Sequence, residues 1–292
     1  MPRLMGILNV NADSFSDPRD VAAGGKDVDR MTLRGTELRG DGADIVDVGA
    51  ESASPATPVI DASAEIDALL PVLEGLHAAG VRTSVDTYKP AVAAACVKAG
   101  TSLINDYSGL ASPELAEICA DGNACLVLTH NPAGVKNKLL DPDGYRNVVD
   151  EVAAWFEAKL AEIDALGLPE ERVWLDPGID LSKTPAQSIE LLRGLGMLAR
   201  FDLPLLVAVS RKDFIGALSP SRPAHRDPGT LAAIGQLIGI PKTVARVHDV
   251  AAAAQYLRVS AALSGQRPLD PQLALPRKLR REEAGNHSVP LR

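Results

Sequence analysis

The chain has 292 residues, of which 46 % are hydrophobic and 23 % are charged, a composition typical of a folded globular protein. Its net charge of −8 argues against broad nucleic-acid binding, which needs a basic face. No apolar run approaches the ~18 residues that cross a membrane, so a membrane protein is also excluded.

Eight short runs of apolar and β-branched residues follow one another along the chain. They span residues 4–10, 44–49, 82–86, 102–106, 124–130, 172–176, 204–210 and 243–248. Each run is apolar on both faces until its end, as is typical of buried parallel strands. Helical periodicity fills the segments between them, for example at 61–80, 145–167 and 249–265. This alternation predicts an α/β fold of the (β/α)8 TIM-barrel type.

A doubly wound open sheet is the alternative architecture, but the first strand is not followed by a glycine-rich dinucleotide turn. We expect a single barrel domain over residues 1–266. Residues 267–292 are rich in Pro and charge and predict a flexible C-terminal tail. The basic run 277–281 within the tail is expected to be solvated, with an interaction site as the alternative.

The cysteines Cys96, Cys119 and Cys125 show no metal-ligand spacing. Their odd number, and an N-terminus that reads directly into a strand, favour a reducing cytoplasmic location. All three lie in Ala-rich or apolar stretches of the sequence, so we expect them to be buried as small hydrophobic residues.

Polar residues gather at the C-terminal end of every predicted strand. In chain order they are Asn9, Asp13, Glu51, Ser52, Asp86, Asn105, Asp106, His130, Asp176, Ser210, Arg211, Lys212, Arg246, His248 and Asp249. Barrel active sites lie at this face. Any one of these residues could be a helix cap or a solvated loop residue, but eight strand ends in phase predict a functional site.

The side chains at three strand ends suggest recognition of a flat heterocycle. Asp86, Asn105 and Asp176 can pair with a ligand edge that carries adjacent N–H donors, such as an aminopyrimidinone. Lys212 and Arg246 can hold a carbonyl, an anion or a stacked aromatic ring.

Two further groups suggest an anion and a hard cation. His248 beside Arg246 could help to bind an anion. Asn9 and Asp13 could hold Mg²⁺ or close over the substrate, because hard cations prefer oxygen ligands.

Four of these residues also have structural interpretations. Asp176 could form a turn with the Pro-Gly that follows it, and Asp249 is expected to cap a helix. Glu51 could orient neighbouring backbone amides. A lone histidine at a strand end, such as His130, is more often hydrogen-bonded for structural reasons.

Seven segments resemble the dihydropteroate synthase family, occur in the family's order and span the predicted barrel. They are GILNVNADSFSD (6–17), GADIVDVGAES (42–52), SVDTYKPAVA (84–93), INDYSG (104–109), DPGIDLSKT (176–184), SRKDFIG (210–216) and RVHDVA (246–251). The SRK and RVHD motifs favour the synthase branch over its methyltransferase relatives. The resemblance implies condensation of 6-hydroxymethyl-7,8-dihydropterin pyrophosphate with p-aminobenzoate in folate biosynthesis, with release of pyrophosphate. It also implies Mg²⁺ and a homodimer that packs through late helices.

The resemblance further implies where each substrate binds. Asp86, Asn105, Asp176 and Lys212 match the family's pterin-binding positions. Ser210 lies where the acceptor pocket forms.

The resemblance also assigns the leaving-group side of the reaction. Asn9, Arg246 and His248 match positions that hold the pyrophosphate and Mg²⁺, with Asn9 as the metal ligand. Asp13 matches a loop residue that stabilises the cation left when pyrophosphate departs. Asp13, Lys212 and Arg246 form the implied catalytic set.

Several loop positions depart from the family pattern, including glycines that are absent from the first loop. Thr-Pro is replaced by Asn11-Ala12, and Thr-Arg by Ala53-Ser54. An apolar residue is replaced by Asn131, and a Phe by Leu181. The lost Arg would contact pyrophosphate and line the acceptor site, and its absence could cost on the order of a hundredfold in activity.

Three hypotheses remain open, of which a working synthase with atypical loops is favoured. The others are a related transferase that uses a different amine, and a pterin-binding protein without catalysis. Lys136 or Lys138 could replace the missing cation, although a solvated loop lysine is expected at each position.

Overall fold

The computed structural model of the protein describes residues 1–10, 28–276 and 279. The chain divides into two compact units, Met1–Leu257 and Arg258–Arg292. The strands all belong to the first unit. The domain boundary expected after residue 266 stays a prediction.

Eight parallel strands form a closed barrel in which each strand pairs with the next and β8 returns to β1. They are β1 (Arg3–Asn9), β2 (Ile45–Gly49), β3 (Thr83–Asp86), β4 (Leu103–Asp106), β5 (Cys125–Thr129), β6 (Val173–Asp176), β7 (Leu205–Ala208) and β8 (Thr243–Val247). Every one lies within two residues of an expected strand. The (β/α)8 prediction is therefore confirmed, and the open-sheet alternative is wrong.

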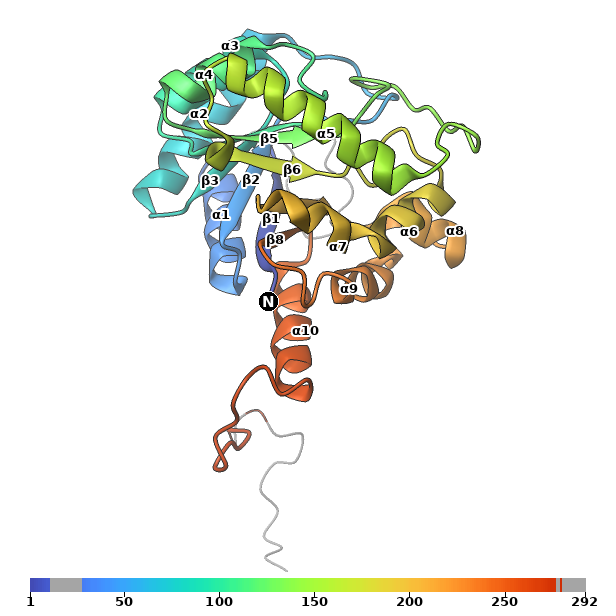
Figure 1. The fold of residues 1–292 in the computed structure, drawn as a ribbon. Coiled ribbons are helices and arrows are strands. Elements are labelled where there is room, and N and C mark those ends of the chain that lie inside the picture. The colour runs from blue at the N-terminus through green and yellow to red at the C-terminus, as the bar shows by residue number, and fades with distance from the viewer. Residues whose placement is uncertain (11–27, 277–278, 280–292) are drawn as a thin grey trace, which may run out of the picture. The chain divides into compact units, whose positions relative to one another are not determined.

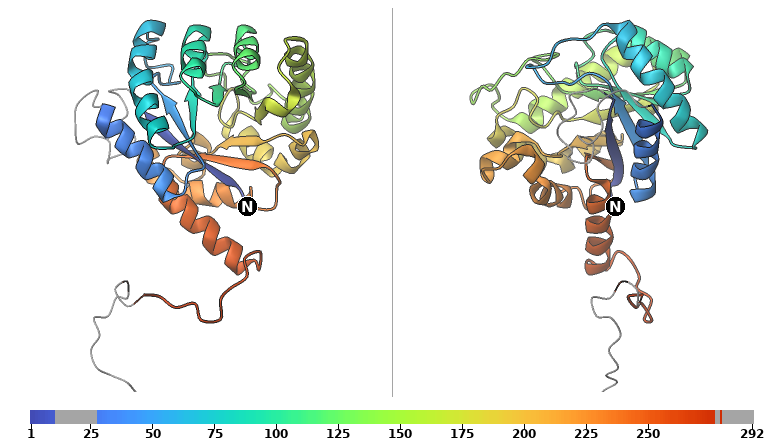
Figure 2. Two further views of the ribbon diagram at one scale, coloured as in Figure 1. Left: turned by 90° about the vertical axis from the view of Figure 1, so that its left-hand side faces the viewer. Right: turned by 180° about the vertical axis from the view of Figure 1, so that it is seen from behind.

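Helices connect the strands and surround the barrel, as Figures 1 and 2 show for the first unit. They are α1 (Val28–Asp41), α2 (Ala62–Ala78), α3 (Pro90–Lys98), α4 (Glu114–Asp121), α5 (Val148–Ala165), α6 (Pro185–Arg193), α7 (Leu195–Leu198), α8 (Asp213–Leu218), α9 (Asp227–Gly235) and α10 (Val250–Leu263). Short 3-10 turns occur at Glu170–Arg172, Ala199–Phe201 and Pro223–His225. The three expected helices correspond to α2, α5 and α10. All three start at side-chain caps, because Asp61, Asn147 and Asp249 accept backbone N–H groups of the first turn.

The apolar core has two parts because side chains alternate between the faces of each strand. The larger part lies between strands and helices. The smaller part is a plug inside the barrel, formed by Met5, Ile45, Leu103, Val127, Trp174, Leu206 and Val244. The immediate neighbours of the plug residues along the strands, such as Val46 and Ile104, belong to the outer core.

The same alternation places a polar layer next to the plug. Two residues after a plug residue, the chain again faces the interior, and these positions hold Asp47, Asn105, Asp176 and Arg246. Strand register adds Asp86, which lies opposite Asn105. The fold thus brings these polar groups to one end of a closed barrel.

Two predictions about burial and the membrane can be compared with the structure. Cys96 and Cys119 are buried and Cys125 is half-buried, and all three are free thiols. In the part of the chain that the structure describes, no helix is both long and apolar enough to span a membrane.

Candidate active site at the C-terminal mouth of the barrel

A network of buried and half-buried polar side chains lies next to the apolar plug. Asp47 on β2 has no solvent exposure, and its Oδ2 accepts hydrogen bonds from Arg246 Nε at 2.6 Å and from Asn105 Nδ2 at 3.0 Å. Arg246 Nη2 donates to Asp86 Oδ2 at 2.7 Å. Four strands, β2, β3, β4 and β8, each contribute one member. The structure therefore brings the predicted residues Asp86, Asn105 and Arg246 together, through an aspartate that was not predicted.

Two carboxylates in this network share one guanidinium. Burial raises the pKa of Asp86 to about 7 against the attraction of Arg246, and repulsion by Asp47 contributes to the increase. Burial lowers the pKa of Arg246, but the charges of Asp47 and Asp86 outweigh it and raise the pKa above its usual range. Near neutral pH Asp86 can hold or release a proton, so it can either donate to or accept from a bound heterocycle.

The carboxylate of Asp176 belongs to the same layer and is attracted by the charges of Lys212 and Arg246. Asp176, at the end of β6, is 5 % exposed, and its Oδ1 accepts the backbone N–H of Gly178 at 2.8 Å. Burial raises the pKa of Asp176 against the charges of Lys212 and Arg246. Burial has the opposite effect on Lys212 and lowers its pKa, because burial disfavours the charged form of each group. Asp176 therefore makes the expected turn and also faces the same interior as Arg246.

Ser210 and His248 lie together at the rim, beyond β7 and β8. Ser210 Oγ is 2.9 Å from His248 Nδ1 and accepts the His248 backbone N–H at 3.3 Å. Because the hydroxyl already accepts that N–H, it can donate to the ring nitrogen Nδ1, and the His248 ring then carries its own N–H at Nε2. The Nε2–H is the type of donor that an anion needs.

Asn9 ends β1 at the same mouth, opposite Gly49 of β2. Asp13, the other predicted residue of this loop, lies outside the described residues, as do Asn11 and Ala12. Among the described residues no group of three or more His, Cys, Asp or Glu side chains could hold a metal ion. Mg²⁺ takes oxygen ligands and is usually held by one or two carboxylates together with substrate phosphates, and the amide oxygen of Asn9 is a ligand of the same hard type.

A fully buried lysine that was not predicted supports the loop after β6. Lys183 is 1 % exposed, and its Nζ contacts His130 Nδ1 at 2.9 Å and the carbonyl oxygens of His130, Gly178 and Leu181 at 3.0–3.2 Å. Burial lowers the pKa of Lys183 to about 7, and burial together with Lys183 lowers the pKa of His130 to about 3. His130 is therefore neutral and accepts at Nδ1, which agrees with the structural role expected for it. Gly178 has a φ of 69°, and a Cβ there would lie 2.1 Å from the His130 carbonyl oxygen, so only glycine fits.

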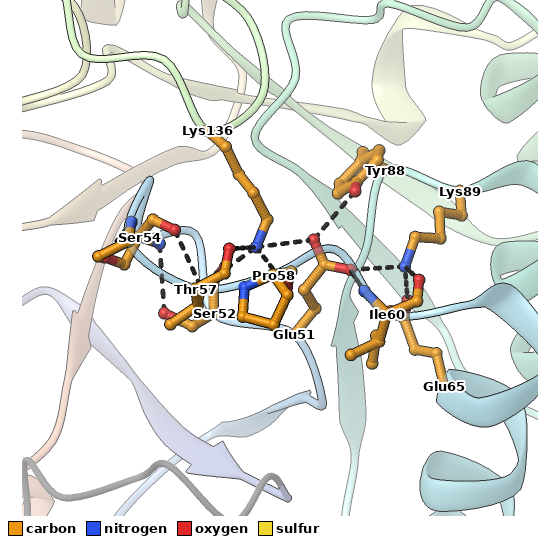
Figure 3. A network of polar contacts seen from close by, with 11 residues as sticks. Glu51, Ser52, Ser54, Thr57, Pro58, Ile60, Glu65, Tyr88, Lys89 and Lys136 are labelled. Carbon is orange, nitrogen blue, oxygen red and sulfur yellow. Dashed lines mark hydrogen bonds and ion pairs between the residues drawn. The ribbon is translucent and has the colours of Figure 1, made fainter.

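Glu51 anchors the loop between β2 and α2 (Figure 3). Its carboxylate accepts the Ile60 backbone N–H at 3.0 Å, the Tyr88 hydroxyl at 2.9 Å and Lys89 Nζ at 2.6 Å. Burial raises its pKa, but the hydrogen bonds from Lys89 and Ile60 outweigh burial and the pKa is lowered. The expectation that Glu51 orients backbone amides agrees with these contacts.

The two loop lysines differ in their surroundings. Lys136 is 11 % exposed and its Nζ lies 3.2 Å from Glu51 Oε1, so the expectation of a solvated side chain is wrong for this residue. Lys138 is 46 % exposed and pairs at 2.6 Å with the exposed Asp213.

Three polar residues at strand ends have structural contacts. Asp249 Oδ1 caps α10 through the Ala252 backbone N–H at 3.0 Å, as expected. Asp106 accepts two backbone N–H groups of the loop after β4 at 2.7 and 2.8 Å. Arg211 Nε pairs with Asp227 at 2.9 Å.

Asp47 and Lys183 were missed by the sequence analysis for different reasons. Asp47 stands inside an apolar strand at an inward-facing position, and a carboxylate there needs a charged partner. That pattern could have identified it. Lys183 lies in a loop after the turn residues, and no periodicity marks its burial.

Comparisons with known proteins agree with this geometry. The sequence model of the pterin binding enzymes matches residues 5–248. A dihydropteroate synthase of Bacillus subtilis is 38 % identical over 267 residues, covering 89 % of this chain and 88 % of the relative. The Xanthomonas albilineans dihydropteroate synthase solved with 4-aminobenzoic acid has a TM-score of 0.80 at 34 % identity, over 90 % of this chain and 93 % of that one. The same enzyme in complex with 7,8-dihydropteroate has a TM-score of 0.76 at 34 % identity, over 90 % and 94 % of the two chains. The chain belongs to the pterin binding enzymes and, within them, to the dihydropteroate synthase family.

Proposed function

We propose that the protein is a transferase that condenses 6-hydroxymethyl-7,8-dihydropterin pyrophosphate with p-aminobenzoate, giving dihydropteroate and pyrophosphate. One observation carries the proposal. Asp47, Asn105 and Asp176 present buried hydrogen-bonding groups, and Asp86 a half-buried one, in the polar layer inside the barrel, beside the cation Arg246. A flat ring edged with N–H donors complements this set. The Xanthomonas structures with 4-aminobenzoic acid and 7,8-dihydropteroate support the choice of substrates.

The reaction breaks the bond between the pterin methylene carbon and the pyrophosphate oxygen, and the electron pair leaves with pyrophosphate. The amine nitrogen of p-aminobenzoate then bonds to the methylene carbon and loses a proton. The chain needs to bind the ring, stabilise the departing anion and orient the amine, and no strong general base is required. Asp86, Asn105, Asp176 and Lys212 would hold the pterin. Arg246 and His248 would stabilise negative charge as it develops on the leaving group.

We also propose Mg²⁺ as the cofactor, with Asn9 and substrate phosphate oxygens as its ligands. When bound, the ion would neutralise part of the pyrophosphate charge. Asp13 is proposed to stabilise the methylene cation, and Ser210 to line the acceptor pocket.

A cytoplasmic homodimer is proposed as the working form. An apolar cavity of about 330 Å³ between α6, α8 and α9, lined by Leu192, Ile215, Leu218 and Ala233 among others, supports an interface on late helices. Leu218 is 70 % exposed in the single chain. Sedimentation at micromolar concentration tests the assembly, and a monomer at that concentration contradicts it.

One assay separates the three candidate functions. The purified full chain is mixed with the pterin pyrophosphate, Mg²⁺ and p-aminobenzoate, and both products are followed. Dihydropteroate formation supports the synthase. Pyrophosphate release that depends on another amine supports a paralogous transferase, which Ser54 in place of the family's Arg would favour. Pterin binding without turnover supports a non-catalytic binding protein.

A further inference from the structure

Lys136 ties two loops of the barrel mouth together (Figure 3). It lies in the loop between β5 and α5, and its Nζ donates to the carbonyl oxygens of Thr57 and Pro58 at 3.0 Å each. It also reaches Thr57 Oγ1 at 3.2 Å and Glu51 Oε1 at 3.2 Å. The three ammonium hydrogens are thus shared among four acceptors of the loop between β2 and α2.

Apart from Lys136, the polar contacts of residues 52–58 of this loop lie within the loop among the described residues, whereas Glu51 and Ile60 near its ends also bond to Lys89. Thr57 Oγ1 donates to the carbonyl oxygens of Ser52 and Ser54 at 3.2 and 2.9 Å, and the Thr57 backbone N–H donates to Ser54 at 3.1 Å. Such short-range contacts shape a turn but do not fix its position relative to the barrel. Lys136 supplies a connection from a different segment.

The loop that carries Lys136 is itself bonded to the neighbouring loops through the side chain of Asn131. Asn131 is 4 % exposed, and its Nδ2 donates to the carbonyl oxygens of Tyr107 and Gly134 at 2.9 Å. Its Oδ1 accepts the Ser182 hydroxyl at 2.9 Å, and that hydroxyl oxygen in turn accepts the Ala133 N–H. The amide at Asn131 therefore has a structural use, because it links the loops after β4, β5 and β6.

The backbone at Lys136 adds a second sign of constraint. Its φ is 55°, in the left-handed region that non-glycine residues seldom adopt. Such a conformation persists where surrounding contacts hold it in place. At Lys136 the hydrogen bonds from its side chain to the carbonyl oxygens of Thr57 and Pro58 are contacts of this kind.

We propose that Lys136 is a positioning residue for the second substrate: it holds the loop of residues 52–58 at the rim and so fixes the entrance by which the arylamine reaches the pterin. The inference rests on the proposed function. The polar layer lies inside the barrel next to the plug. A pterin bound to that layer would leave the rim of the barrel as the side from which an amine can approach. Both loops that Lys136 joins follow the C-terminal ends of strands and so belong to that rim.

Lys136→Met tests the proposal, with Lys138→Met as the matched control in the same loop. Glu51 keeps Lys89, Tyr88 and the Ile60 N–H in the variant, so the fold is expected to stay intact. We expect faster amide hydrogen exchange at residues 52–58 in Lys136→Met but not in Lys138→Met. We also expect the KM for p-aminobenzoate to rise about tenfold, which corresponds to ~1.4 kcal/mol, with an unchanged KM for the pterin pyrophosphate.

Unchanged hydrogen exchange at residues 52–58 would refute the tie between the loops. Equal changes in both KM values, or no change in either, would refute the role in acceptor positioning. If the wild-type chain makes no dihydropteroate, the proposed function fails, and the exchange experiment still decides whether Lys136 holds the loop.

Discussion

Replacing Asp47 by asparagine should lower the pKa of Asp86. Both carboxylates bind the Arg246 guanidinium, Asp47 through Nε at 2.6 Å and Asp86 through Nη2 at 2.7 Å. Groups bridged in this way lie on the order of 6 Å apart, and two unit charges at that separation interact by about 3 kcal/mol at an effective dielectric constant near 20. This energy corresponds to roughly two pH units. The asparagine keeps the shape of Asp47 but removes its charge, so the pKa of Asp86 should fall from about 7 to about 5.

Carbon-13 NMR of the aspartate carboxyl groups measures this change directly. The Asp86 signal is assigned by its loss in Asp86→Asn, and its titration is compared between wild type and Asp47→Asn. Asp44→Asn is the control, because Asp44 is an exposed aspartate at the opposite end of β2. An Asp86 titration midpoint that stays near 7 in Asp47→Asn would show that the two carboxylates are not coupled through Arg246.

Four further predictions test the site and the loop that supports it. Asp176→Asn should weaken pterin binding about tenfold by loss of a charged hydrogen-bond acceptor, and unchanged affinity in calorimetry contradicts the assignment. Ser210→Ala removes a contact that orients His248 and should raise the KM for the pterin pyrophosphate severalfold, whereas Ser210→Thr should not. Ser54→Arg should raise synthase activity, and no change means that another residue fills the role. The pKa of Lys183 is about 7 in the folded protein and near 10.4 when unfolded, so the unfolded chain binds more protons between these pH values. The free energy of unfolding of wild type should therefore rise relative to Lys183→Met from pH 7 to 10 in urea titrations, and a constant difference contradicts this.

The barrel was predictable because each strand is a short, two-sided apolar run, which only a buried parallel sheet explains well. The same logic predicted that Asp86, Asn105, Asp176 and Lys212 would converge at one mouth, since parallel strands end there. Pattern reasoning did not extend to Lys183, whose burial depends on carbonyl oxygens that the fold alone brings together.

The loops were less predictable, because their contacts join segments far apart in sequence. Lys136 bonds to residues 79 and 78 positions earlier, Thr57 and Pro58. In the sequence Asn131 stands where the family has an apolar residue, yet its side chain connects three loops. A departure from a family pattern indicates that a position has changed, but the partner it has gained becomes known only from the structure.

The buried charges of the polar layer do not favour the stability of the fold, and ligand binding explains why they are present. Asp47 Oδ1 is buried and has no hydrogen-bond partner among the described residues, and Asp86 and Asp176 both have pKa values raised by burial. Buried charges such as these cost more to desolvate than their mutual attraction commonly returns. A ligand edge with N–H donors would supply the hydrogen bonds that the layer lacks, so part of the cost of folding is recovered on binding. Apolar residues in place of Asp47 and Arg246 should then leave the barrel folded and unable to bind a pterin, as expected where substrate binding rather than stability determines the residues.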